Sequence, residues 1–267
     1  MTKTAPEADL TGWTCEPFTA AGFTHDVYHR GSGPGVVLIP EMPGVHTGVL
    51  ALGNYLVDNG FTVAIPSLYG TPGMSPRSPA LVPNLLRGCV AKEFAAVALN
   101  RERPVANYLR ALARDLNAKT PGKGVGVIGQ CFSGGFALAA AVDDSVLASV
   151  LSQPSVPLPL TARHKRDPGF SEREMKVIEK RASEEGLCAL GLRFSGDPMA
   201  PGERFTTLKE RLGDNFEVIE LDSSPGNAGG FGRMAHSVLT LEVRDTPGQQ
   251  AYEARKRVME FLKERLG

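Results

Sequence analysis

Residues 123–141 read KGVGVIGQCFSGGFALAAA, and this stretch decides the fold. An apolar, strand-like run leads into Gly129-Gln130-Cys131-Phe132-Ser133-Gly134-Gly135, and small residues that suit a helix follow. This order matches the G-x-nucleophile-x-G pattern, in which a sharp strand-to-helix turn holds a nucleophile above a sheet. Small residues flank such a turn because larger side chains would collide with the neighbouring strand and helix. The ordinary alternative is a buried packing cysteine, which the strand-turn-helix context disfavours.

Short β-branched runs alternate with longer helix-compatible stretches along the rest of the chain. Strands are predicted at 35–40, 62–66, 125–129, 147–151, 188–194 and 216–221, with an antiparallel edge strand at 25–30. Helices are predicted at 47–59, 91–117, 134–142, 171–185, 202–212 and 247–265. This alternation indicates an α/β fold with a mainly parallel central sheet and helices on both faces, in one domain over residues 1–267.

Two proline- and glycine-rich stretches, 66–83 and 153–169, are long for connections in a compact domain. Such segments are often lids or binding loops. We therefore interpret residues 153–187 as a possible rim or lid insertion.

Composition limits the classes of partner. Lysine plus arginine and aspartate plus glutamate each number 29, so no net charge attracts nucleic acid or an anionic membrane. The N-terminus lacks a basic, then apolar, signal pattern, and no apolar run approaches the roughly 20 residues of a membrane span. We expect a cytoplasmic protein, monomeric or homodimeric, that acts on a small molecule. The four cysteines show no CxxC pairing, so neither a metal site nor a cofactor is expected.

A cysteine nucleophile needs a base and an acid, which follow it in the order acid, then histidine, in this kind of fold. His236 lies in a flexible stretch after the last predicted strand, whereas His164, the other histidine beyond Cys131, lies in a basic proline-rich loop. Asp197 follows the preceding strand in the segment GLRFSGDP, where it could also be an ordinary turn residue. Their order along the chain favours Cys131, Asp197 and His236 as a set.

Four segments carry a resemblance to the dienelactone hydrolase family, whose members are cysteine enzymes of the α/β-hydrolase fold. They are EMPGVHTGVLALGNYLVDNGFTVAIPSLYG, GQCFSGGFALAA with GLRFSGDP, and AHS, and the similarity extends from about residue 35 to residue 265. The resemblance implies a Cys131-His236-Asp197 triad and implies that Glu41 receives the thiol proton. It also implies cleavage of a small carboxylic ester or lactone through a thioester acyl-enzyme.

Two backbone N–H groups are expected to form the oxyanion hole: that of Phe132, just after the nucleophile, and that of Met42, after the first core strand. Burial should raise the pKa of Glu41 unless a cation pairs with it.

Some positions depart from the family pattern. Ser133 stands where a glycine is usual, and Thr240 stands where archetypal members carry an arginine four residues after the histidine. Recognition of a substrate carboxylate is therefore not assumed. Arg233 could replace that arginine, although a lone loop arginine is more often solvated, and Tyr69 is a further weak candidate for substrate binding.

Other functions stay open on these residues. A thioesterase or acyltransferase would use the same constellation. A non-catalytic member would bind a small ligand in the inherited pocket. A redox sensor would pair Cys131 with Cys89 or Cys188, neither of which is its neighbour in sequence.

Overall fold

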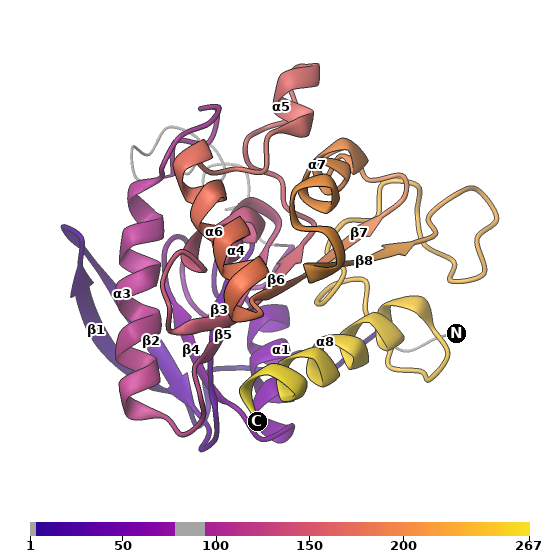
Figure 1. Ribbon diagram of the computed structural model, residues 1–267. Helices are drawn as coiled ribbons and strands as arrows, with labels where there is room; N and C mark the ends of the chain where they lie inside the picture. The colour runs from indigo at the N-terminus through magenta and orange to yellow at the C-terminus, as the bar shows by residue number, and fades with distance from the viewer. Residues whose placement is uncertain (1–3, 78–93) are drawn as a thin grey trace.

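The computed structural model describes residues 4–77 and 94–267, and one eight-stranded sheet crosses the centre of this part of the chain (Figure 1). The strand order is β1-β2-β4-β3-β5-β6-β7-β8. β2 runs antiparallel to both of its neighbours, and all other pairs are parallel. The strands are β1 (Thr14–Ala20), β2 (Phe23–Arg30), β3 (Gly35–Ile39), β4 (Thr62–Pro66), β5 (Val125–Gln130), β6 (Val146–Ser152), β7 (Cys188–Phe194) and β8 (Phe216–Leu221).

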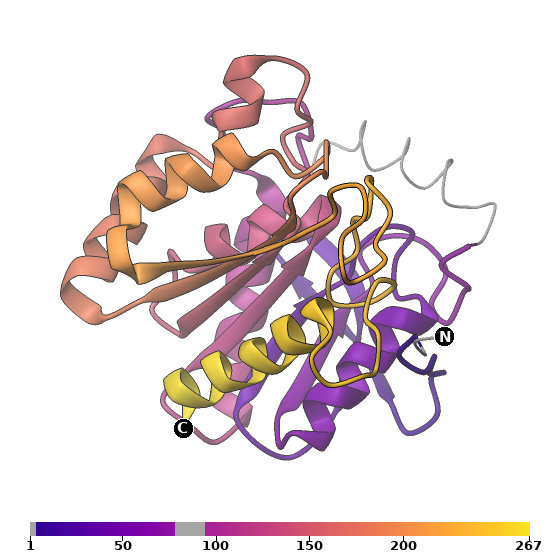
Figure 2. The same ribbon diagram turned by 90° about the vertical axis from the view of Figure 1, so that its right-hand side faces the viewer.

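Helices cover both faces of the sheet, and each face has its own apolar cluster (Figures 1 and 2). One face carries α1 (Thr47–Asp58) and α8 (Gln250–Leu266). The other carries α3 (Pro104–Lys119), α4 (Gly134–Ala140), α6 (Glu172–Glu185) and α7 (Gly202–Leu212), with the short α5 (Ala162–Arg166) nearby. The predicted α/β-hydrolase type of fold is confirmed. No helix among residues 4–77 and 94–267 is long and apolar enough to cross a bilayer.

The predicted helix over 91–117 is wrong at its start. Residues 91–93 lie outside the described residues, and the chain from 94 to 103 forms turns and bends. α3 begins at Pro104, with Arg103 as its N-cap. Proline lacks the N–H that a continuing helix needs and disfavours a helical conformation in the residue before it, so it suits only the first turn.

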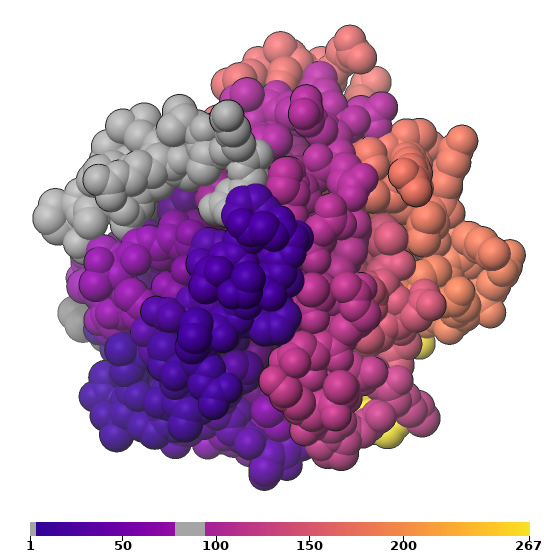
Figure 3. All heavy atoms as spheres, turned by 90° about the vertical axis from the view of Figure 1, so that its left-hand side faces the viewer, coloured from indigo at the N-terminus to yellow at the C-terminus, as the bar shows by residue number. Residues whose placement is uncertain are grey.

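Two elements were not predicted. β1 contains Pro17 and is mostly exposed, which is compatible only with an edge strand. Figure 3 shows the indigo N-terminal strands at the surface beside the magenta region of the chain. α5 is a five-residue basic helix without a buried side chain, so it carries no apolar periodicity.

The parallel strands β3, β5, β6 and β7 all end at the same edge of the sheet. The residues that follow them are Glu41, Cys131, Gln153 and Asp197, and the loop after β8 carries His236. This arrangement brings side chains distant in sequence to one edge.

Candidate active site

Cys131 occupies the turn between β5 and the helical residues that follow. It has a φ of 51°, in the left-handed region that non-glycine residues seldom adopt, and it begins a 3-10 turn (Cys131–Ser133) that continues into α4. A Cβ on Gly129 would lie 2.4 Å from the Ser133 carbonyl oxygen, and one on Gly134 would lie 2.6 Å from the Pro154 Cα. Glycine at these positions therefore lets the chain form the strained turn that presents Cys131.

Ser133 ties this turn to the end of β3, which explains why a serine can replace the usual glycine. Its side chain is buried, and its Oγ accepts from the Gln130 N–H at 3.1 Å. The same Oγ lies 3.0 Å from the Pro40 carbonyl oxygen, to which it can donate. A glycine would leave these backbone groups without this partner.

Asp197 and His236 form the shortest connection between the β7 and β8 loops. His236 Nδ1 lies 2.6 Å from Asp197 Oδ2, and Asp197 Oδ1 accepts from the Met199 N–H at 2.9 Å. Asp197 is 3% exposed, whereas the side chain of His236 is 24% exposed. A buried carboxylate on Nδ1 orients the ring and leaves Nε2 to face a reacting group.

The pKa of His236 shows that Cys131 lies within electrostatic reach. Burial lowers this pKa, but the charge of Cys131 and hydrogen bonding with Asp197 and Cys131 raise it to about 11. The imidazolium is therefore favoured when the sulfur is negative. The structure brings Cys131, His236 and Asp197 together.

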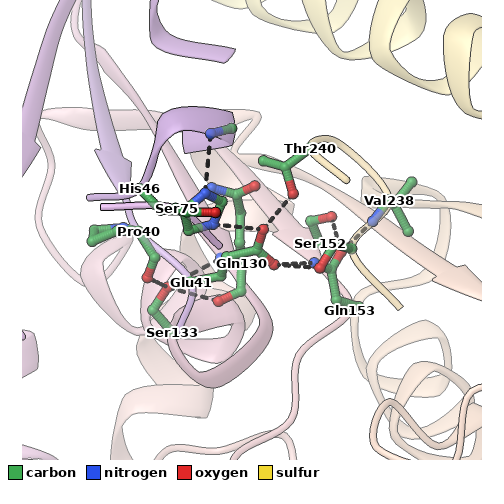
Figure 4. A network of polar contacts seen from close by, with 12 residues as sticks. Pro40, Glu41, His46, Ser75, Gln130, Ser133, Ser152, Gln153, Val238 and Thr240 are labelled. Carbon is green, nitrogen blue, oxygen red and sulfur yellow. Dashed lines mark hydrogen bonds and ion pairs between the residues drawn. The ribbon is translucent and has the colours of Figure 1, made fainter. Parts of the chain in front are cut away.

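Glu41 lies at the centre of a buried polar network (Figure 4). Its Oε1 accepts hydrogen bonds from His46 Nε2 at 3.3 Å and from the Thr240 hydroxyl. Its Oε2 accepts hydrogen bonds from Gln153 Nε2 at 3.2 Å and from the Ser237 hydroxyl at 2.8 Å. Among the described residues, the carboxylate makes no hydrogen bond with Cys131 Sγ.

The pKa of Glu41 moves opposite to the direction expected from burial. Burial does raise this pKa, but interactions with His46 and Thr240 and the charge of His236 outweigh burial and lower it. The lowering is the exception that the expectation allowed, because hydrogen bonds and the charge of His236 offset burial, and Glu41 is a buried carboxylate held in its ionised form.

The two candidate substrate-binding residues, Tyr69 and Arg233, lie in different surroundings. Tyr69 donates to the Pro40 carbonyl oxygen and contacts the rings of Phe94 and Phe132 edge-on, at centroid distances of 5.8 and 6.0 Å. Burial raises the pKa of Tyr69 well above its usual value, and the charge of Cys131 raises it further, so Tyr69 lies near Cys131. Arg233 is exposed and, among the described residues, forms no ion pair.

The two residues expected to supply oxyanion N–H groups, Phe132 and Met42, follow β5 and β3. Phe132 is the second residue of the 3-10 turn, where backbone N–H groups lack intrahelical partners, and its side chain is buried. Met42 follows Glu41 beyond β3 and is 9% exposed. The Met42–Pro43 peptide bond is cis.

Sequence reasoning missed four polar residues of the site. Ser155 Oγ lies 3.9 Å from Cys131 Sγ, and the Ser155 N–H donates to the Cys131 carbonyl oxygen at 2.9 Å. The others, His46, Gln153 and Ser237, all surround Glu41. These four residues follow strands or lie beside His236 in the sequence. Because the carboxyl ends of parallel strands meet at one edge of a sheet, this position could have predicted that they belong to the site.

The segment 153–187 is attached to the rest of the fold by two buried arginines. Arg204 donates to the carbonyl oxygens of Pro154, Pro157, His164 and Asp167. Arg103 donates to that of Gly169. Burial lowers the pKa of each guanidinium to about 10, so both stay charged at neutral pH. These bonds fix the path of residues 154–169 beside Cys131.

The strand register places Cys188, one of the two cysteines considered as a redox partner, far from Cys131. In the register of the sheet, Cys188 on β7 pairs with Ala148 on β6, and Ala148 pairs with Gly126 on β5. Gly126 lies five residues before Cys131. In parallel strands this separation is roughly 16 Å along the sheet. Cys188 therefore lies at the wrong end to pair with Cys131, and Cys89 lies outside the described residues. Within the described part of the chain, no three His, Cys, Asp or Glu side chains gather as metal ligands do.

The strand order, the cysteine on its strained turn and the Asp197–His236 pair define an α/β-hydrolase-type protein. The dienelactone hydrolase family model matches residues 23–266, so the chain belongs to this family.

Solved structures of low sequence identity share the fold. A putative dienelactone hydrolase from Klebsiella pneumoniae is 16% identical with a TM-score of 0.62, over 94% of this chain and 99% of that one. A dienelactone hydrolase-like promiscuous phosphotriesterase from metagenomic libraries is 18% identical with a TM-score of 0.63, over 96% and 98%. An esterase from Pyrococcus furiosus is 15% identical with a TM-score of 0.55, over 99% and 100%. No curated protein matches the sequence. At these identities the neighbours establish the fold alone.

Proposed function

We propose that the protein hydrolyses a small carboxylic ester or lactone, with Cys131 as nucleophile, His236 as acid and base, and Asp197 as the group that orients His236. The observation that carries this proposal is the 2.6 Å contact between His236 Nδ1 and buried Asp197, on a ring whose pKa responds to Cys131. A base oriented by a third group and coupled to a nucleophile is the arrangement that covalent catalysis requires.

The reaction proceeds in two halves. The Cys131 thiolate attacks the acyl carbon, the C–O bond to the leaving group breaks, and the His236 imidazolium gives its proton to the departing oxygen. Neutral His236 then takes a proton from water, whose oxygen attacks the thioester carbon. The C–S bond breaks, the acid leaves, and the thiolate–imidazolium pair is restored. The N–H groups of Phe132 and Met42 would stabilise the oxyanion in both halves.

The surroundings of Cys131 favour a substrate without a carboxylate beside the acyl group. Thr240, at the position of the family's usual arginine, directs its hydroxyl to Glu41, and Arg233 is exposed. Glu41 adds a buried negative charge close to His236. We therefore propose a neutral ester or lactone, with Tyr69 and the Ser155 loop, part of the 153–187 rim, on the substrate side.

The test compares wild type with Cys131→Ser on a panel that contains an aryl ester, a lactone and a thioester, each with and without a carboxylate on the acyl part. We expect wild-type turnover, loss of at least roughly 10²-fold in the variant, and a mass increase equal to the acyl group on wild-type Cys131. Equal rates for both proteins would refute Cys131 as nucleophile. A preference for thioesters over oxygen esters would favour the thioesterase alternative.

A further inference from the structure

The loop that carries His236 is long and irregular. Residues 222–249 connect β8 to α8 and contain only one isolated β-bridge, at Arg244. Asp197 holds the imidazole from one side. On either side of His236 the side chains of Ala235, Val238 and Leu239 are buried in an apolar cluster, so packing already holds the loop and its polar contacts act in addition.

Glu41 and Gln153 hold the residues directly after His236. The Ser237 hydroxyl donates to Glu41 Oε2 at 2.8 Å, and the Thr240 hydroxyl donates to Glu41 Oε1. The Val238 N–H donates to Gln153 Oε1 at 3.3 Å, and Gln153 Nε2 itself donates to Glu41. Three of the four residues after His236 are therefore attached, directly or through Gln153, to one carboxylate at the end of β3.

The carboxylate has no acceptor site left for the thiol. An ionised carboxylate offers about four lone-pair sites, and here four side-chain donors, two on each oxygen, surround it. Glu41 is 1% exposed, so water does not replace these donors. A thiol proton would have to displace one of them.

His46 fixes the orientation of Glu41 from the opposite side. His46 Nδ1 accepts from the Gly48 N–H at 3.0 Å and caps the N-terminus of α1. Because Nδ1 accepts, the ring proton lies on Nε2, which faces Glu41 at 3.3 Å. The helix cap thereby selects the tautomer that donates to the carboxylate (Figure 4).

We propose that Glu41 is a positioning residue that holds the His236 loop in place through Ser237 and Thr240, and does not serve as the resting partner of the Cys131 thiol. Thr240 thus has a different task from the substrate-binding arginine of archetypal members. The inference rests on the proposed function, in which His236 alone exchanges the proton with Cys131.

The experiment uses Ser237→Ala and Thr240→Val, which remove one donor each and leave Glu41 in place. Ser224→Ala, an exposed serine in the same loop, is the matched control, and Thr240→Ser is the conservative rescue. Three readouts are taken: kcat and KM with the best ester, the rate of Cys131 alkylation by iodoacetamide across pH, and the proton NMR signal of the His236–Asp197 hydrogen bond.

We expect Ser237→Ala and Thr240→Val each to lower kcat by roughly tenfold or more with little change in KM, because small displacements of a catalytic group are costly. Both should broaden or shift the His236 signal, Thr240→Ser should restore it, and Ser224→Ala should match wild type. Glu41→Gln combined with Thr240→Val should be no worse than Glu41→Gln alone.

The opposite pattern would overturn the proposal. If Glu41→Gln changes the alkylation profile while Ser237→Ala and Thr240→Val leave alkylation, kcat and the His236 signal unchanged, then Glu41 acts on the thiol directly. Should wild type cleave no ester at all, the proposed function fails, but the NMR signal and the alkylation rates still decide whether Glu41 positions His236.

Discussion

His236 and Asp197 lie 39 residues apart in sequence, yet His236 Nδ1 and Asp197 Oδ2 approach to 2.6 Å. The carboxylate is almost fully buried, so its charge acts on the imidazole with little screening by water. Replacing it by an amide keeps the shape of the side chain but removes the charge.

We expect Asp197→Asn to lower kcat for ester hydrolysis by roughly 10²-fold or more, because the ring loses its fixed tautomer and the support for its positive charge. The measurement is kcat at pH 7, with thermal unfolding to confirm that the variant folds. Asp214→Asn, on an exposed turn, is the control. An Asp197→Asn enzyme with wild-type kcat would remove Asp197 from the mechanism.

The charge of His236 should control the reactivity of Cys131. Since the thiolate is the reactive form and the imidazolium beside it favours negative charge, His236→Gln should slow iodoacetamide alkylation of Cys131 at pH 7 by about tenfold or more. The pKa of His236 is raised to about 11, so the imidazolium is present through the neutral range and is lost only as the pH rises through that value. The difference between variant and wild type should shrink as the pH rises above about 8.5, the ordinary pKa of a cysteine thiol, because a thiol then ionises without help from an imidazolium.

Labelling must be assigned by peptide mass, because Cys15 is also exposed. A Cys15→Ser background removes that signal, and Cys131→Ser in the same background identifies the labelled site. Equal alkylation rates in wild type and His236→Gln at pH 7 would contradict the pairing.

Glu41 should contribute stability that depends on pH in the acid range. Its pKa in the folded protein lies below the ordinary 4.5, so the unfolded chain binds more protons as the pH falls. The contribution is therefore present above pH 4.5 and is lost as the pH falls through the folded-state value. The free energy of unfolding of wild type should exceed that of Glu41→Gln at pH 6, and the difference should shrink below pH 4.5.

Urea denaturation at several pH values measures this difference. Glu210→Gln, at an exposed position, should give a difference from wild type that does not vary with pH. A Glu41→Gln difference that grows in acid would show that the folded protein holds Glu41 with a raised pKa.

Arg204 should be required for the stability of the segment beside Cys131. Arg204→Met leaves the carbonyl oxygens of Pro154, Pro157, His164 and Asp167 without their donor, at a cost of roughly 3 kcal/mol or more. Urea denaturation gives the loss, and hydrogen exchange should show faster exchange over residues 153–169. Arg163→Met, an exposed arginine in the same segment, should be nearly neutral. Slow exchange over 153–169 in Arg204→Met would mean that other contacts hold this segment.

The sequence by itself determined the parallel core and the turn that carries Cys131. Continuous apolar runs such as 125–129 need no distant partner to be recognised as buried strands, and the glycines around Cys131 meet a local steric requirement. The order Cys131, Asp197, His236 also followed from the strands that precede each residue.

Only the tertiary structure decided what surrounds Glu41. His46, Gln153, Ser237 and Thr240 come from separate connections, and nothing local in the sequence says that their donors meet at one carboxylate. The direction of the Glu41 pKa depends on this convergence, because burial and hydrogen bonding act in opposite senses and their balance is a property of the packed side chains. Periodicity can report local chain conformation, but distances between residues 199 positions apart exist only once the sheet has formed.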